Sequence, residues 1–278
     1  MASEVTGHLR RLVARRAEDS LLARGALEIA RLEYPDLDPE EYLRRLDEYA
    51  ERVRGGTAPG AGLTDRVLTL NRVLFEEEGY AGNLEEYYDP RNSFLNDVMD
   101  RRLGLPITLS IVYLEVGRRA GLAVEGVSFP GHFLVKVPVQ GGALVLDPFD
   151  AGRSLDEDDL REQLAQVYGD DPAPSVTQLL GAASPREILV RLLRNLKGVY
   201  LRRNQLEKVL EVMNCVLAIA PELAAEVRDR GRLLERLECL RPALEDYQRY
   251  LELVPDAPDS DQVRRDLIRI QQDAQRIH

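Results

Sequence analysis

A histidine and an aspartate lie on two short segments that read as consecutive strands, and together they could form two members of a catalytic triad. His132 opens a segment with alternating apolar residues, and Asp147 closes the next one within Leu146-Asp147-Pro148. A histidine can accept the proton of a nucleophile while a carboxylate holds its imidazole in place. Hydrolysis or acyl transfer at this pair would therefore require a nucleophile close to His132.

The nearest hydroxyl groups belong to Thr108 and Ser110, which follow the turn Gly104-Leu105-Pro106. The segment from Ile107 onward is apolar nearly all round, so we expect a buried helix. The free N–H groups at its start could stabilise an oxyanion. Thr108 lies about half a turn beyond Pro106 and would point elsewhere, and an alcohol is far harder to ionise than a thiol. A hydrolase or acyltransferase using Thr108 or Ser110 is therefore the second interpretation.

Neither cysteine is expected to be a nucleophile. Cys215 and Cys239 are far from the histidines in sequence and lie in segments that read as helical, so we expect buried small hydrophobic residues in a reducing compartment.

The acidic run at 156–159 overlaps the capping-box pattern Ser154-Leu155-Asp156-Glu157, which is typical of a helix start and not of a metal site. We expect no metal and no cofactor.

The elements that must position these residues are mostly helices. The first hundred residues read as helices interrupted by Pro35 and by a glycine-rich connection at 55–62, and beyond Ser184-Pro185 the chain returns to helices. Between them, a switch to period-two alternation predicts one hairpin. Phe133, Val135 and Val137 fall on one side of its first strand, and His132, Leu134 and Lys136 on the other.

The C-terminal helices carry a repeat. Four residues recur after a displacement of 34 residues: Leu210, Glu211, Leu217 and Pro221 become Leu244, Glu245, Leu251 and Pro255. This displacement is the period of the tetratricopeptide helix-turn-helix unit. Gly231 and Ala243 occupy the small-residue positions where the paired helices approach closely. About two repeats and a capping helix over 261–277 fit the remaining length.

Several blocks of the chain resemble the transglutaminase-like family. Family members carry a Gly-x-Cys turn opening a helix that ends in Arg-x-x-Gly, a His-x-x-Val strand and a strand closing with Asp-Pro. The matching segments here are Gly104-Leu105-Pro106, Arg118-Arg119-Ala120-Gly121, His132-Phe133-Leu134-Val135 and Leu146-Asp147-Pro148. A closer resemblance is to its SirB-one branch of bacterial proteins, carried by Asp89–Asn96, Gly104–Ser110 and Phe129–Phe133.

The resemblance implies an α+β fold: a helical N-terminal region and a papain/transglutaminase-like core with a small antiparallel sheet, followed by all-α tetratricopeptide repeats. We expect domains at residues 1–174 and 185–278. It also implies that His132 and Asp147 are a remnant dyad, while Pro106 stands where the family has its catalytic cysteine. A proline has no nucleophilic group, so a non-catalytic protein acting as a protein- or peptide-binding module is the first interpretation.

The hairpin register decides whether His132 meets Asp147. A four-residue loop over 138–141 would place the two directly opposite each other, with Val135 facing Leu144. A two-residue turn at Gly141-Gly142 would place Asp147 opposite Lys136, as a cross-strand ion pair without chemistry. The family resemblance favours the first register.

A polar cluster in and just after the segment Asp89–Asn96 has two interpretations. Arg91, Asn92, Asn96 and Asp97 could line the same cleft as the dyad, or they could supply capping and turn contacts after Pro90. The adjacent Tyr87 and Tyr88 could form a surface patch, but core or staple packing is the expected role.

Charge and hydropathy limit the partners. The formal net charge is −11 and the pI is near 5.0, and no basic stripe with interleaved aromatic residues offsets it, so nucleic acid is not expected as a direct partner. No apolar run of membrane-spanning length is present. We therefore expect a cytoplasmic protein with a protein or peptide partner and no membrane contact, its oligomeric state left open.

Overall fold

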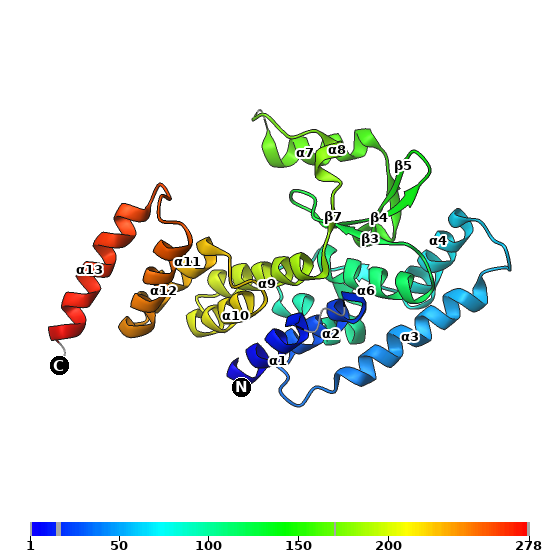
Figure 1. Cartoon of the computed structure of the whole chain (residues 1–278). Helices are drawn as coiled ribbons and strands as arrows, with labels where there is room; N and C mark the ends of the chain where they lie inside the picture. Colours follow the sequence, from blue (N-terminus) through cyan, green and yellow to red (C-terminus); the bar gives the residue numbers. More distant parts are fainter. Residues whose placement is uncertain (1, 15–17, 170, 277–278) are drawn as a thin grey trace. The chain divides into compact units, whose positions relative to one another are not determined.

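The chain folds into two compact units. The computed structural model describes residues 2–14, 18–169 and 171–276 (Figure 1). One unit is Arg15–Leu192, and the other combines Met1–Ala14 with Leu193–His278. The first helix, which the expected limits of 1–174 and 185–278 assign to the first domain, thus groups by its contacts with the C-terminal helices. Those domain limits stay a prediction.

The unit Arg15–Leu192 contains both helices and sheet. Its helical elements are α2 (Glu18–Ala30), α3 (Pro39–Gly56), α4 (Leu63–Asn71), η1 (Arg72–Glu77), η2 (Pro90–Ser93), α5 (Leu95–Arg101), α6 (Pro106–Arg119), η3 (Pro148–Asp150), α7 (Glu157–Tyr168), α8 (Val176–Leu179) and the start of α9 (Pro185–Arg202). Its strands are β1 (Ala81–Gly82), β2 (Leu103–Gly104), β3 (Glu125–Val127), β4 (Leu134–Val139), β5 (Gly142–Asp147), β6 (Arg153–Leu155) and β7 (Ala182–Ala183). β1 and β2 pair in parallel, and the other strands form one antiparallel sheet in the order β6-β5-β4-β3-β7. The predicted α+β class with a small antiparallel sheet is confirmed.

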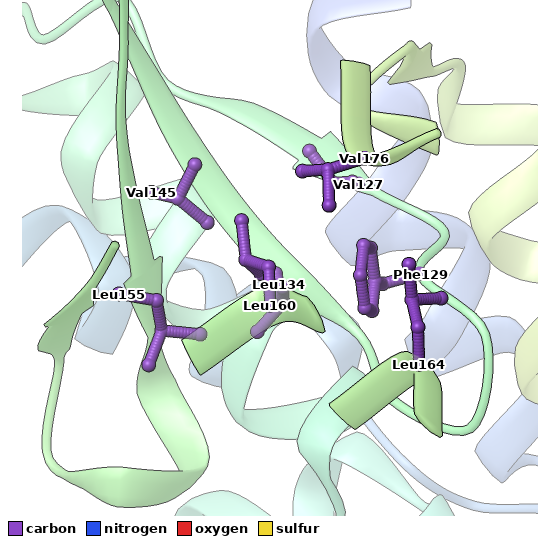
Figure 2. Packing of buried hydrophobic residues seen from close by; sticks show 8 residues of the cluster. All are labelled: Val127, Phe129, Leu134, Val145, Leu155, Leu160, Leu164 and Val176. Atoms are coloured by element: carbon purple, nitrogen blue, oxygen red, sulfur yellow. The ribbon is translucent and has the colours of Figure 1, made fainter. Parts of the chain in front are cut away.

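One face of this sheet is covered by α7 and α8. Figure 2 shows Leu134 and Val145 of the sheet beside Leu160 and Leu164 of α7 and Val176 of α8. The remaining members of this apolar cluster are Val127, Phe129 and Leu155. α7 begins where Asp156 accepts hydrogen bonds from the N–H groups of Asp158 and Asp159. The acidic run is therefore a helix start, as predicted, although the capping residue is Asp156 and not Ser154.

α6 packs on β3 and β4 and is surrounded by α2, α3 and α5. Every residue from Pro106 to Gly117 is buried, which confirms the prediction made from its apolar sequence. Pro106 occupies the first turn, where the missing N–H removes no intrahelical hydrogen bond. The turn before α6 is held by Thr108, whose Oγ1 accepts a hydrogen bond from the backbone N–H of Leu105 at 2.8 Å.

The observed hairpin register differs from both expected ones. Val135 pairs with Leu146 and Val139 pairs with Gly142, so the loop consists of Gln140 and Gly141, and Gly141 adopts a φ of +85°. Lys136 faces Val145 and contacts Glu125 at 3.2 Å, which rules out its pairing with Asp147. The three registers differ by shifts of two residues in each step, so the alternation of apolar and polar residues is the same in all of them.

The second unit is all-helical and contains the predicted repeat. Its elements are α1 (Ala2–Ala14), the end of α9, α10 (Leu206–Ile219), α11 (Ala224–Arg236), α12 (Leu240–Leu253) and α13 (Ser260–Arg276). α10 and α12 begin 34 residues apart, in agreement with the repeat. α1 packs against α10, although the sequence suggested that it belongs to the N-terminal lead-in. The last two residues of the chain, including the predicted end of the capping helix at Ile277, lie outside the described residues.

The paired helices α11 and α12 approach closely at Gly231. A Cβ at this position would lie 2.9 Å from the ring of Tyr247, so the predicted small-residue position is confirmed.

The expected burial of the two cysteines is confirmed for one of them and wrong for the other. Cys215 is buried, and burial raises the pKa of its thiol to about 12, whereas Cys239 is exposed because it precedes α12 as its N-terminal cap.

Glu226 of α11 should make the stability of this unit depend on pH. It is buried, and it accepts hydrogen bonds from Arg194 at 2.8 Å and Lys197 at 2.7 Å. Burial opposes its ionisation, but the two cations hold the pKa of Glu226 below its ordinary value. A carboxyl with a lowered folded pKa stabilises the fold fully above its unfolded pKa, about 4.3, and loses that contribution as the pH falls through the folded pKa. Thermal unfolding should therefore separate the wild type from Glu226→Gln at pH 7, with the difference shrinking below pH about 4.3; a constant difference would contradict this assignment.

Candidate functional site

His132 and Asp147 lie in contact although they are not directly opposite each other in the sheet. Nε2 of His132 lies 2.9 Å from each carboxylate oxygen of Asp147. His132 stands before the first residue of β4, so its imidazole reaches Asp147 diagonally across the end of the hairpin. The structure thus brings the expected pair together through a register that the sequence did not predict.

Asp147 is oriented by the turn that follows β5. Its Oδ1 accepts the backbone N–H of Phe149 at 2.9 Å, and its own carbonyl accepts the N–H of Gly152 at 2.8 Å. The carbonyl of Gly152 accepts a hydrogen bond from Asn71, which is bound in turn by Tyr113 of α6. Gly152 adopts a φ of +73°, and a Cβ there would collide with Asn71. The carboxylate is therefore fixed before it meets the histidine.

This geometry determines the tautomer of neutral His132. An ionised carboxylate only accepts hydrogen bonds, so Nε2 must carry the proton and Nδ1 must offer a lone pair. No group among the described residues forms a hydrogen bond with Nδ1. Long-range ¹H–¹⁵N NMR of histidine-labelled protein should report the Nε2–H tautomer in the wild type and a tautomer mixture in Asp147→Ala. The Nδ1–H tautomer in the wild type would contradict the pairing.

The two candidate nucleophiles are engaged in structural contacts. Thr108 is buried, and its single proton can be donated to the carbonyl of Asn92, 2.9 Å away. Ser110 is also buried, and its Oγ lies 3.4 Å from the carbonyl of Phe133. No hydrogen bond joins either hydroxyl to His132 in the described parts of the chain. A base and its orienting carboxylate are thus present without a hydroxyl aimed at the base.

Aromatic side chains surround the imidazole on one side. The ring of Phe149 lies edge-on to His132 with centroids 5.9 Å apart, and Tyr87 lies edge-on to Phe149 at 6.4 Å. Phe149 packs directly on Gly82, where a Cβ would lie 2.5 Å from its ring. Tyr87 and Tyr88 are 37% and 53% exposed, so the core part of the expectation of core or staple packing is wrong for this pair. They extend the aromatic surface from the dyad toward solvent.

Asn92 holds the loop that carries Tyr87. Its side chain is fully buried; its Nδ2 donates to the carbonyl of Glu86 at 2.7 Å and to that of Tyr87 at 3.3 Å. Its Oδ1 accepts from Asn83 at 3.0 Å and from Arg101 at 3.4 Å. Asn92 therefore supplies turn contacts and holds the loop that places Tyr87 beside Phe149.

The other three cluster residues lie elsewhere around α5. Arg91 pairs with Asp89 at 2.6 Å and is half exposed. Asp97 accepts a hydrogen bond from Tyr34 at 2.6 Å, and burial raises the pKa of its carboxyl. Asn96 is buried with its Oδ1 unpartnered. Among the described residues, no hydrogen bond or ring contact joins Arg91, Asn96 or Asp97 to the dyad, so their assignment to the cleft stays a prediction.

Arg191 of α9 was not expected from the sequence, yet it contacts the turn that carries His132. Its Nη2 donates to the carbonyl of Phe129 at 2.9 Å and to that of His132 at 2.5 Å, and its guanidinium lies over the ring of Phe133. An arginine within a helical pattern carries no signal of such a contact, because the acceptors lie about sixty residues away in sequence.

The described residues contain no group of three or more His, Cys, Asp or Glu side chains that could hold a metal ion. None of the helices formed by residues 2–14, 18–169 and 171–276 combines the length and apolar character needed to cross a membrane.

Comparison with known proteins agrees with this architecture. The chain matches the transglutaminase-like superfamily over residues 40–194 and the tetratricopeptide repeat over residues 196–267. It is 42% identical to a UPF0162 protein of Xylella fastidiosa, over 91% of each chain. It is 34% identical to a UPF0162 protein of Pseudomonas aeruginosa and 27% identical to protein SirB1 of Salmonella typhimurium, in both cases over 86% of this chain and 87% of the relative. The chain therefore belongs to the SirB1 and UPF0162 family, in which a transglutaminase-like domain is followed here by tetratricopeptide repeats.

Proposed function

We propose that the transglutaminase-like domain is a non-catalytic binding module that holds a segment of a partner protein at the His132–Asp147 site. The observation that carries this proposal is the start of α6, where the superfamily resemblance places a cysteine and this chain has Pro106. A proline has no group that His132 could activate. The oriented imidazole is then left as a hydrogen-bonding group beside exposed aromatic side chains, which is an arrangement suited to binding.

The tetratricopeptide unit supplies the second half of the proposed function. Such repeats generally bind proteins through the faces of their stacked helices, and we propose that they recruit the same partner. The expected location is the cytoplasm, in which the exposed thiol of Cys239 would stay reduced.

Photo-cross-linking of the full chain tests this proposal. A photoreactive amino acid replaces Tyr88, which is exposed beside Tyr87, and in a second protein it replaces Ile268 of α13. We expect one partner to be captured from both positions, and His132→Ala to reduce capture at position 88 while thermal stability stays near that of the wild type. Capture at position 88 that is indifferent to both His132→Ala and Tyr87→Ala would contradict a binding role for this site.

The His132–Asp147 pair itself favours one alternative, a hydrolase or acyltransferase that uses Thr108 or Ser110. This alternative requires the hydroxyl to abandon its backbone acceptor and turn toward His132. A fluorophosphonate probe should therefore leave folded wild-type protein unlabelled. Labelling that is lost in Thr108→Val or Ser110→Ala, and also in His132→Ala, would favour the enzyme.

A further inference from the structure

The guanidinium of Arg191 has no carboxylate partner within the part of the chain that the structure describes. Its polar contacts there are the carbonyls of Phe129 and His132, both to Nη2, so Nε and Nη1 remain available. Arg45 and Arg102 of the same unit contact Asp100 and Glu78, whereas Arg66 and Arg118, like Arg191, donate only to backbone carbonyls among the described residues. Arg191 differs from these two in its place, because its acceptors belong to the turn that carries His132.

Arg191 also belongs to a chain of contacts that leads through His132 and Phe149 to Tyr87. Its Nη2 binds the backbone of His132, whose ring meets Phe149, which in turn meets Tyr87. Tyr87 lies close enough to Arg191 for each to influence the ionisation of the other. These contacts place the guanidinium of Arg191, His132, Phe149 and Tyr87 in one neighbourhood of the unit.

An uncompensated guanidinium at this position has an energetic consequence. Burial lowers the pKa of Arg191, but an arginine does not deprotonate in a protein, so the cost of burying the charge persists. A carboxylate bound to the guanidinium would offset this cost and accept two charge-assisted hydrogen bonds from it in a bidentate arrangement. The single positive charge of the guanidinium matches one carboxylate, whereas Nδ1 of neutral His132 only accepts hydrogen bonds.

We infer that the cluster of His132, Tyr87, Phe149 and Arg191 binds a carboxylate whose neighbouring group is aromatic or apolar. The carboxylate lies on Nε and Nη1 of Arg191, and the neighbouring group packs on Phe149 and Tyr87. This inference rests on the proposed binding function and names its ligand class. The carboxylate could be a peptide C-terminus or an acidic side chain, and the two sources are distinguished below.

Four small probes that form matched pairs test this on the full-length protein. N-acetylphenylalanine and N-acetylphenylalanine amide differ in a terminal carboxylate, while the amides of N-acetyl-Phe-Glu and N-acetyl-Phe-Gln differ in a side-chain carboxylate. The readout is the ring ¹⁵N signal of His132, because the chain has only three histidines to label and His132→Ala assigns the signal. We expect one acid of a pair to shift this signal at millimolar concentration while its uncharged counterpart does not; the pair that responds identifies the source.

Two variants separate the charge of Arg191 from its structural contact. Arg191→Gln keeps a donor for the backbone carbonyls but removes the charge, and we expect at least about tenfold weaker binding of the acid, given that hydrogen bonds to charged groups contribute about 1.5–3 kcal/mol. Arg118→Gln is the matched control, since Arg118 also donates to a backbone carbonyl, that of Val124, and should leave binding unchanged. Unchanged ring signals in the ligand-free Arg191→Gln protein show that His132 has kept its place.

Three outcomes would overturn the inference: equal shifts with acid and amide, no shift with any probe, or stronger binding of inorganic phosphate than of either acid. Each leaves the cross-linking test at position 88 intact. Failure of the carboxylate inference is therefore distinguishable from failure of the proposed binding function.

Discussion

Replacing Asn92 by alanine is expected to destabilise the transglutaminase-like domain by about 2–4 kcal/mol, because each buried polar group left without a partner costs about 1–3 kcal/mol. The side chain is fully buried and forms hydrogen bonds with Glu86, Tyr87, Asn83 and Arg101. Its loss leaves the carbonyl of Tyr87 and the side-chain N–H of Asn83 without this partner, whereas the carbonyl of Glu86 still accepts the N–H of Asp89. Chemical unfolding followed by circular dichroism measures the change in stability, and hydrogen exchange of residues 83–92 should accelerate.

The same change should weaken binding of the partner at the His132–Asp147 site, because the freed loop carries Tyr87 away from Phe149. Asn195→Ala provides a matched control on an exposed face of α9, where substitutions usually change stability by less than about 0.5 kcal/mol. Equal effects of Asn92→Ala and Asn195→Ala on stability would show that Asn92 does not hold the loop that carries Tyr87.

Removal of Asp246 should have the largest effect in the tetratricopeptide unit. The buried carboxylate of Asp246 binds Arg230 through two hydrogen bonds of 2.6 and 2.7 Å, and Arg230 also donates to Asn214 at 2.8 Å. The three residues join α12, α11 and α10. Asp246→Ala leaves the guanidinium uncompensated, and breaking a buried pair in this way costs about 3–5 kcal/mol. Thermal and urea unfolding should both register the loss.

Asp261→Ala tests whether burial is the reason. Asp261 pairs with Arg264 at 2.8 Å, but its side chain is 82% exposed, and exposed pairs contribute less than about 1 kcal/mol. An Asp261→Ala effect as large as that of Asp246→Ala would refute the burial argument. If the repeats recruit the partner, Asp246→Ala should also reduce cross-linking from position 268.

The site combines a histidine that could act as a base, His132, with a proline, Pro106, at the position where the family resemblance places the nucleophile. Asp147 is held by the N–H of Phe149 and by the turn at Gly152, a support that is well suited to orienting an imidazole. The same support serves binding equally well, because a fixed imidazole presents Nδ1 in one direction to a ligand. Retained orientation of His132 is therefore compatible with loss of catalysis.

Features governed by neighbouring residues could be predicted from the sequence. The apolar segment after Pro106 is a buried helix, the acidic run at 156–159 is a helix start, and the displacement of 34 residues separates α10 from α12. Each depends on periodicity or on capping within a few residues, which the chain carries locally. The strands β3, β6 and β7 were not predicted, because two or three residues are too few to display an alternation.

The sequence by itself determined the family, the kinds of elements and the absence of a thiol at the start of α6. Only the tertiary structure decided the hairpin register, because a shift of two residues leaves every side chain on the same face. It alone also brought Arg191 to the turn of His132 and Tyr87 to the ring of Phe149. Such contacts join residues far apart in the chain, and their partners depend on how helices and strands pack together, which no local pattern encodes.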